Sequence, residues 1–134
     1  MPERKVIDSW ALLAWLLNQS AAAKVEVFLQ EADAANLQLR MSWINAGEVY
    51  YISAKRLGPH LAEEFLKRLP SLPVRMVVPT ESDIISAARL KGSRRLSYAD
   101  AFAAALAIRE GCSLITGDPE LAGLNDLLPI DWIG

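Results

Sequence analysis

Four acidic residues stand along the chain at positions where a carboxylate could help to bind a cation. Asp8 and Asp118 each follow a short apolar segment, and Asp100 lies near the start of a helical segment. Glu48 lies among neighbours that are almost all apolar. Four carboxylates that converge would repel one another and raise their pKa values unless a cation were bound. Hard oxygen ligands select Mg²⁺ or Mn²⁺, so this set predicts metal-dependent chemistry.

Three of these acids also have a purely structural interpretation. Asp8 and Asp118 each stand where an N-cap residue would accept a hydrogen bond from the first amides of a helix. Pro119, at the first helical position, favours that interpretation for Asp118. Ser97 and Asp100 form a variant of the capping box, with Asp in place of Glu or Gln. The spacing alone leaves the metal-binding and the capping interpretations open.

Glu48 has no capping interpretation. The residues three and four positions away on its helix face are apolar or aromatic except for Asn45. An acid in this setting either lies on a narrow polar stripe with Asn45 or points into a pocket that holds a counter-ion. The adjacent Gly47 costs a helix about 1 kcal/mol relative to Ala, which indicates a close approach by another group.

Alternating strands and helices must position these acids. Strands are expected at residues 4–7, 37–42, 74–78, 113–116 and 130–133. Helices are expected at 10–17, 21–34, 44–56, 60–69, 81–90, 97–110 and 119–121, with a polar loop at 91–96. The strand at 37–42 alternates apolar and polar residues, which predicts one half-exposed face.

Strands separated by helices predict a mainly parallel sheet with helices on both faces. We therefore expect a three-layer α/β/α sandwich with a central sheet of four to five strands. The 134 residues suit a single domain that spans 1–134. In such folds the carboxyl ends of the strands share one edge, and functional residues gather there.

Composition sets limits on the class of protein. The chain is 52% apolar and 22% charged, with a net charge of −2 and one cysteine. One cysteine excludes an internal disulfide framework and fits a cytoplasmic location. The longest apolar run, Trp10 to Leu17, has eight residues, whereas a membrane-spanning helix needs about 20. The mild acidity argues against coating nucleic acid by bulk charge, but not against a nucleic-acid enzyme, because the placement of the charges matters there.

Four segments in this order and spacing resemble a PIN domain, and within that family a VapC-type toxin ribonuclease of a toxin–antitoxin system. They are VIDSWALL, NAGEVYY, LSYADA and LITGD, at residues 6–13, 45–51, 96–101 and 114–118. No single segment is specific, but the ordered set spans essentially the whole chain. The resemblance implies a PIN-like fold and metal-dependent endonucleolytic cleavage of RNA. It also implies a homodimer and a small cognate antitoxin that blocks the acidic pocket.

The resemblance also assigns roles to residues. Asp8 and Asp100 would be the principal ligands of one or two Mg²⁺ or Mn²⁺ ions. Glu48 would be a ligand or orient water, and Asp118 would bind metal directly or through water. The residues implied to support these acids are Ser9, Asn45 and Thr116.

Two residues depart from the family pattern. Trp10 stands where a small residue is more common, and Gly117 replaces a basic residue often found between the Thr and the Asp. Neither residue is an implied ligand, so these departures concern the choice of substrate more than the chemistry.

Basic residues precede the Asp100 helix, and Lys91, Arg94 and Arg95 could contact RNA phosphates beside the metal site. A solvated loop that keeps the domain soluble explains them equally well. Two other functions stay open as alternatives. A catalytically inactive PIN-like module that binds nucleic acid or protein would be expected to have lost an acid. A phosphoryl-accepting domain would be expected to carry paired acids after its first strand and a lysine after its last, and the chain has neither.

Overall fold

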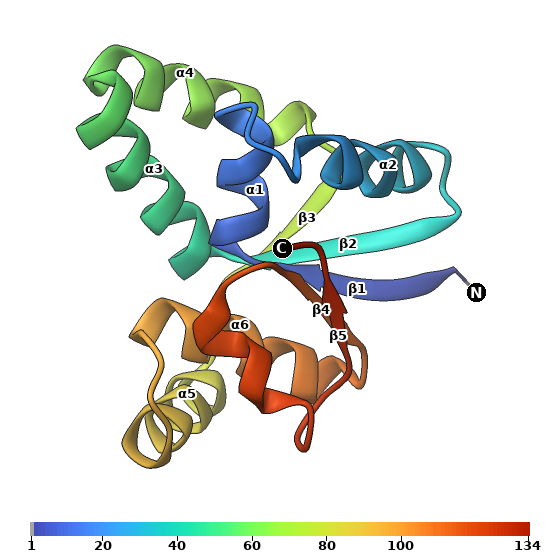
Figure 1. The fold of residues 1–134 in the computed structure, drawn as a ribbon, viewed down its shortest axis with the longest axis vertical. Coiled ribbons are helices and arrows are strands. Elements are labelled where there is room, and N and C mark those ends of the chain that lie inside the picture. Colours follow the sequence, from blue (N-terminus) through green and yellow to red (C-terminus); the bar gives the residue numbers. More distant parts are fainter. Residues whose placement is uncertain (1) are drawn as a thin grey trace.

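The computed structural model describes residues 2–134 and places five strands in one sheet (Figure 1). The strands are β1 (Glu3–Ile7), β2 (Leu37–Ser42), β3 (Val74–Val77), β4 (Ser113–Thr116) and β5 (Ile130–Trp132). Their order is β3-β2-β1-β4-β5, and every neighbouring pair is parallel. The order reverses between β1 and β4, so the carboxyl ends of these two central strands form the topological switch point at which such sheets bind ligands.

Helices cover both faces of the sheet. They are α1 (Ser9–Leu16), α2 (Ala22–Asp33), α3 (Trp43–Leu57), α4 (Pro59–Arg68), α5 (Glu81–Ser93) and α6 (Tyr98–Glu110), with short 3₁₀ helices η1 (Leu69–Ser71) and η2 (Pro119–Leu124). Figure 1 shows α1 to α4 on one side of the sheet and α5, α6 and η2 on the other. Alternate residues of β1 enter separate cores, with Ile7 in the first and Val6 in the second. The expected three-layer α/β/α sandwich is confirmed.

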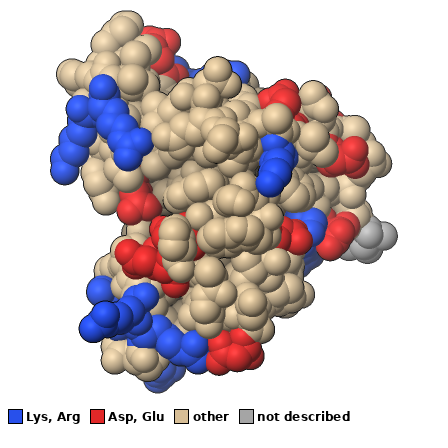
Figure 2. All heavy atoms as spheres, viewed as in Figure 1, with Lys and Arg blue, Asp and Glu red and all other residues tan. Residues whose placement is uncertain are grey.

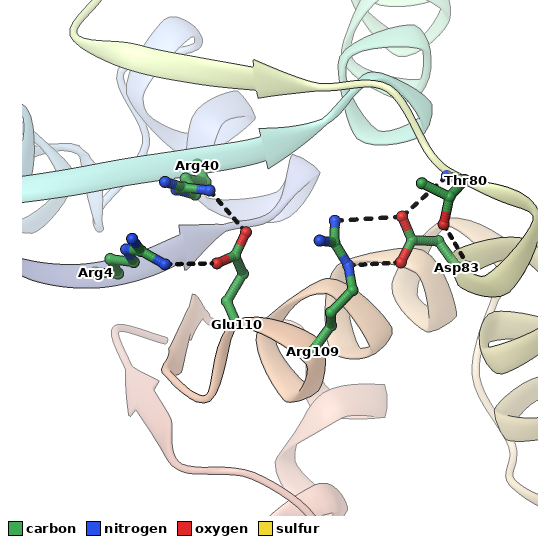
Figure 3. Close-up of polar contacts among 6 residues, drawn as sticks. All are labelled: Arg4, Arg40, Thr80, Asp83, Arg109 and Glu110. Atoms are coloured by element: carbon green, nitrogen blue, oxygen red, sulfur yellow. Dashed lines mark hydrogen bonds and ion pairs between the residues drawn. The ribbon is translucent and has the colours of Figure 1, made fainter.

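The alternation predicted for β2 is confirmed from Leu37 to Met41, where the apolar residues are buried and Gln38 and Arg40 are partly exposed. This strand lies between β1 and β3 and contacts α2, α3 and α6. Arg40 of β2 points to α6, where its Nη1 donates to Oε1 of Glu110 at 2.7 Å (Figure 3). The polar half of the alternation therefore reflects an ion pair with a helix, and the sequence pattern does not distinguish such a partner from water.

Helix α6 begins and ends where its residues predict. The Ser97 side chain accepts a hydrogen bond from the Asp100 amide at 3.1 Å, and Gly111 ends the helix in the left-handed conformation with φ of 64°. Every residue from Asp100 to Ala107 is buried. The five alanines in that stretch allow the helix backbone to approach the sheet closely.

Ion pairs hold the far end of α6 in place (Figure 3). Glu110 pairs with Arg4 of β1 at 3.1 Å as well as with Arg40. Arg109 Nε lies 2.7 Å from Asp83 Oδ1, and Asp83 also closes the capping box at the start of α5. These contacts fix α6, which carries Asp100 at its opposite end, against the sheet and α5.

The expected polar loop at 91–96 begins later than predicted, because α5 runs to Ser93. The amide of Arg94 still donates to the Leu90 carbonyl at 2.9 Å, which continues the helical pattern. Lys91 lies in the last turn, where a cation interacts favourably with the helix dipole. Within residues 2–134, no helix combines the length and apolarity needed to cross a membrane.

Candidate metal centre

The acids that follow the two central strands are joined by one hydroxyl group. Asp8 comes directly after β1, and Asp118 follows two residues after the end of β4. Thr116, the last residue of β4, donates its hydroxyl hydrogen to Oδ2 of Asp8. The same Thr116 oxygen accepts a hydrogen bond from the Asp118 amide at 3.0 Å. The neighbouring strands β1 and β4 thus bring together two acids that are 110 positions apart in the sequence.

Asp100, at the start of α6, lies close to Asp118 in a group of carboxylates that does not include Asp8. Carboxylate oxygens of Asp100, Asp118 and Glu120 lie within 4.8 Å of one another. Sequence reasoning missed Glu120, because the residues from Pro119 onward were interpreted only as the start of a short helix. Its side chain is exposed, and its Oε2 accepts a hydrogen bond from the Ser97 amide at 2.9 Å. A second acid two residues after Asp118 was the signal that could have indicated it.

The capping interpretations are confirmed for two acids and wrong for the third. Asp8 caps α1 by accepting from the Ala11 amide at 2.9 Å, and Asp118 caps η2 by accepting from the Glu120 amide at 2.9 Å. The reciprocal half of the box predicted for Ser97 and Asp100 does not form, because Glu120 accepts the Ser97 amide hydrogen instead. The Asp100 carboxylate is therefore free of the capping role.

The surroundings of Asp8 and Asp100 disfavour a negative charge on each of these two carboxylates. Asp8 is fully buried, and burial raises its pKa to about 7; the charges of Asp118 and Glu48 act in the same direction, while hydrogen bonds from Thr116 and Ala11 oppose it. The pKa of Asp100 is raised to about 8, first by burial and then by the charges of Asp118 and Asp8. Each of these acids is thus held in a site that favours the protonated form in the absence of a cation.

The donor set fits a divalent cation with oxygen ligands. No ion pair within residues 2–134 includes Asp8, Asp100 or Asp118, so no Lys or Arg of that part of the chain balances their charge. Mg²⁺ is commonly held by one or two carboxylates together with water, which this arrangement of half-exposed and buried acids permits. Buried acids with raised pKa values and no protein cation nearby are typical of such functional sites.

Ser9 and Asn45 connect the N-terminal ends of three helices around the acids. The Asn45 side-chain amide donates to Oγ of Ser9 in α1 at 3.0 Å and to the carbonyl of Ala99 in α6 at 3.1 Å. Asn45 is fully buried, and its Oδ1 has no hydrogen-bond partner among the described residues. These hydrogen bonds connect Ser9, which follows Asp8, with Ala99, which precedes Asp100.

Glu48 lies at the margin of the site. It is half-buried on α3, and its Oε2 accepts a hydrogen bond from the Tyr51 hydroxyl at 3.3 Å. Its charge reaches Asp8, whose pKa it raises, but no Lys or Arg in the described chain forms an ion pair with it. The counter-ion that the sequence suggested is therefore not a protein side chain. The close approach predicted at Gly47 is wrong, because a Cβ there would meet nothing within 4 Å.

Comparison with protein families matches residues 5–127 to the PIN domain. The chain belongs to the PIN domain family. No match to a curated protein was found by sequence comparison. VapBC2 from Rickettsia felis, solved with a DNA fragment from its promoter, aligns with a TM-score of 0.71 and 14% identity over 96% of this chain and 97% of that chain.

Two further solved structures are similar to this PIN domain. VapC20 from Mycobacterium tuberculosis, described as a sarcin–ricin loop cleaving toxin, aligns with a TM-score of 0.71 and 17% identity over 86% of this chain and 90% of that chain. VapBC-1 from nontypeable Haemophilus influenzae aligns with a TM-score of 0.68 and 20% identity over 96% and 97%. At these identities the likeness establishes a shared fold.

Basic side chains of this PIN domain lie beside the acids. A hollow of about 470 Å³ is lined by Lys91, Arg95, Leu96, Ser97 and Glu120. Figure 2 shows acidic side chains in the recess between the two helix layers, with basic side chains on the lower layer next to them. The third basic residue of the predicted set, Arg94, pairs instead with Asp126 on the surface at 2.7 Å. Two basic side chains and one acid of the carboxylate group, Glu120, thus line the same hollow.

Proposed function

We propose that this PIN domain is a Mg²⁺-dependent endoribonuclease, the toxin component of a type II toxin–antitoxin pair, which hydrolyses RNA phosphodiesters with metal-activated water. The convergence of Asp8, Asp100 and Asp118 at the switch point of the sheet, with no protein cation among the described residues to balance them, carries this proposal. Its fold is shared with VapC20, which is described as a sarcin–ricin loop cleaving toxin. That likeness supports RNA as the substrate class.

Each residue of the site has a part in the proposed reaction. Asp8, Asp100 and Asp118 would hold one or two Mg²⁺ or Mn²⁺ ions, and Glu48 would be a ligand or orient water. When bound, the metal would lower the pKa of a water molecule and neutralise charge on the phosphate. Thr116 keeps Asp8 in place by its hydrogen bond. Ser9 and Asn45 hold the helix starts that carry Asp8 and Asp100.

The basic side chains would bring the RNA to this centre. Carboxylates without a cation repel a phosphodiester, so the backbone needs positive groups beside the site. Lys91 and Arg95 are exposed and line the same hollow as Glu120. Arg94 would have to release Asp126 before it could bind a phosphate. We therefore assign the phosphate contacts to Lys91 and Arg95.

The proposal includes the partners and location of a toxin. We propose a cognate antitoxin protein that binds over the acidic site, a homodimer, and action in the cytoplasm, where cellular RNA is exposed to the enzyme. The similar folds of VapBC2 and VapBC-1, both toxin–antitoxin complexes, support an antitoxin partner. Co-expression of the gene with its immediate neighbour, followed by size-exclusion chromatography, tests both the complex and the dimer.

A cleavage assay with matched variants tests the enzyme. Purified protein is incubated with structured RNAs in Mg²⁺ or in EDTA, together with Asp8→Asn, Asp100→Asn and the control Asp33→Asn. Asp33 is an exposed acid at the end of α2, on a helix that does not reach the metal centre. We expect Mg²⁺-dependent cleavage by the wild type and the control, and loss of cleavage in the other two variants. Binding of RNA without cleavage would identify an inactive binding module and refute the proposal.

A further inference from the structure

The loop that carries Asp118 is packed against the helix that follows Asp8. Gly117 is buried between Thr116 and Asp118. A Cβ at Gly117 would overlap the ring carbons Cη2 and Cζ3 of Trp10, and would lie 2.8 Å from the Cα of Gly134. Within residues 2–134 the glycines with positive φ are Gly58 and Gly111, so Gly117 does not serve an unusual backbone conformation. A glycine is required at this position because the indole ring occupies the space of a side chain.

The packing at Gly117 extends to Gly134. A Cβ at Gly134 would lie 2.9 Å from the carbonyl oxygen of Gly117 and 2.8 Å from Cζ2 of Trp132. The amide of Ile133 donates to the Thr116 carbonyl at 3.0 Å. The Cβ position of Gly117 is therefore filled by the Trp10 ring and by the backbone of Gly134, and the Trp132 ring fills the Cβ position of Gly134. This arrangement prevents the loop from moving toward α1 without displacing the Trp10 ring.

The contact between Trp10 and Gly117 joins the two backbone segments that carry Asp8 and Asp118, the acids proposed to bind one metal. Trp10 is two residues after Asp8, and Gly117 directly precedes Asp118. The Thr116 hydroxyl bridges the same two segments, because it donates to Asp8 and accepts from the Asp118 amide. The hydrogen bonds of Thr116 hold the two segments together at Asp8. The contact between the Trp10 ring and Gly117 sets the distance between the same two segments at the next residue of the loop.

We propose that Trp10 and Gly117 are a positioning pair that sets the spacing of Asp8 and Asp118 for a divalent cation. The pair touches neither substrate nor metal and acts through the two acids beside it. The inference rests on the proposed function in one respect, which is that Asp8 and Asp118 are ligands. Residues that orient metal ligands typically change the metal affinity by about 10-fold to 100-fold when they are substituted.

A double-mutant cycle tests the pair, with Gly117→Ala, Trp10→Phe and the double variant. The phenyl ring is shorter than the indole and removes the two carbons that would collide with a Cβ at position 117. Trp15→Phe is the matched control for the ring, because Trp15 is also half-buried on α1 and its Nε1 donates to Glu26. Gly92→Ala is the control for the glycine, because a Cβ there meets nothing within 4 Å.

The primary readout is the Mg²⁺ concentration that gives half of the metal-dependent rise in melting temperature, measured from chelator-treated protein. RNA cleavage as a function of Mg²⁺ is the second readout. We expect Gly117→Ala to raise the half-saturating Mg²⁺ concentration about tenfold or more. In the Trp10→Phe background the same substitution should change it by less than about threefold, because the two ring carbons of the closest contacts are absent and only the contact with the Gly134 Cα remains. Both controls should keep the wild-type value, whatever they do to the melting temperature in EDTA.

Several outcomes would refute the proposed positioning role of Trp10 and Gly117. A folded Gly117→Ala variant with the wild-type Mg²⁺ dependence would do so, and so would an equal loss in both backgrounds. If Gly117→Ala does not fold, Trp10→Phe decides the matter, and a half-saturating concentration equal to that of Trp15→Phe overturns the proposal. If Mg²⁺ does not raise the melting temperature of the wild type, the metal site itself is refuted. This outcome is distinct from failure of the Trp10–Gly117 pair, because it is seen in the wild type alone.

Discussion

Replacement of Asp8 by asparagine should stabilise the metal-free protein at alkaline pH. Burial raises the pKa of Asp8 from 3.8 to about 7, so the folded state holds a proton on this group that the unfolded chain has released. Stability is therefore full below the unfolded pKa and falls as the pH rises toward 7. At about 1.4 kcal/mol for each pKa unit, the cost of the charged, buried carboxylate reaches about 4 kcal/mol above that pH.

Asparagine removes this charge and keeps the local structure. Asn is as good an N-cap as Asp, and its side-chain oxygen can accept the Ala11 amide hydrogen that Asp8 now accepts. Its amide nitrogen can donate to the Thr116 hydroxyl oxygen in place of the present hydrogen bond. The variant should therefore exceed the wild type by up to about 4 kcal/mol at pH 8.5 in EDTA, and match it near pH 4.

Urea denaturation followed by circular dichroism measures this difference. Wild type, Asp8→Asn and Asp33→Asn are compared in EDTA at several pH values between 4 and 8.5. Saturating Mg²⁺ should then stabilise the wild type at pH 8 and leave Asp8→Asn almost unchanged, because a ligand stabilises only the form that binds it. A loss of stability of about 1 kcal/mol in Asp8→Asn at every pH would refute the reasoning, since Asn keeps the cap and the loss would show that the charged carboxylate of Asp8 stabilises the fold.

Three further predictions concern the metal, the RNA and the fold. The half-saturating Mg²⁺ concentration should rise as the pH falls below about 7, because protons compete for Asp8 and Asp100; titrations of the metal-dependent melting temperature at pH 6 and 8 measure this. Replacing Lys91 and Arg95 by alanine should raise the KM for RNA and reduce its dependence on salt, with little change in kcat, as steady-state cleavage at two salt concentrations will show. Glu110→Gln should cost about 3 kcal/mol in urea denaturation, because its two arginine partners lose their carboxylate.

Local chemistry in the sequence predicted most of the elements that carry the site. The segment from the Ser97 cap to the Gly111 stop folds as α6, and the strand predicted at residues 4–7, before Asp8, is part of β1. These features can be predicted from the sequence because caps, helix stops and apolar runs depend on residues close together in the chain. The same chemistry identified Asp8, Asp100 and Asp118 as candidate ligands, and the motif order indicated the PIN domain family that the profile match confirms.

The order of the strands in the sheet could not be predicted from local sequence. This order is what brings the residues of the candidate metal centre together. Neighbouring positions for β1 and β4 place Thr116 between Asp8 and Asp118, although more than a hundred residues separate these acids in the sequence. The partner of a polar strand residue was equally hidden, because the alternation in β2 did not show that Arg40 pairs with Glu110. A pattern records that a residue is polar, but only packing determines what it faces.

The two unusual residues at the site show the same division most clearly. From the sequence, Trp10 and Gly117 are separate departures from the family pattern, and the glycine that suggested a close contact was Gly47. In the structure a Cβ at Gly47 would meet open space, whereas one at Gly117 would overlap the Trp10 ring. The sequence by itself determined the elements and the acids, through interactions of short range. The tertiary structure decided which acids meet and what holds them there, because close packing between distant segments depends on all of the intervening chain.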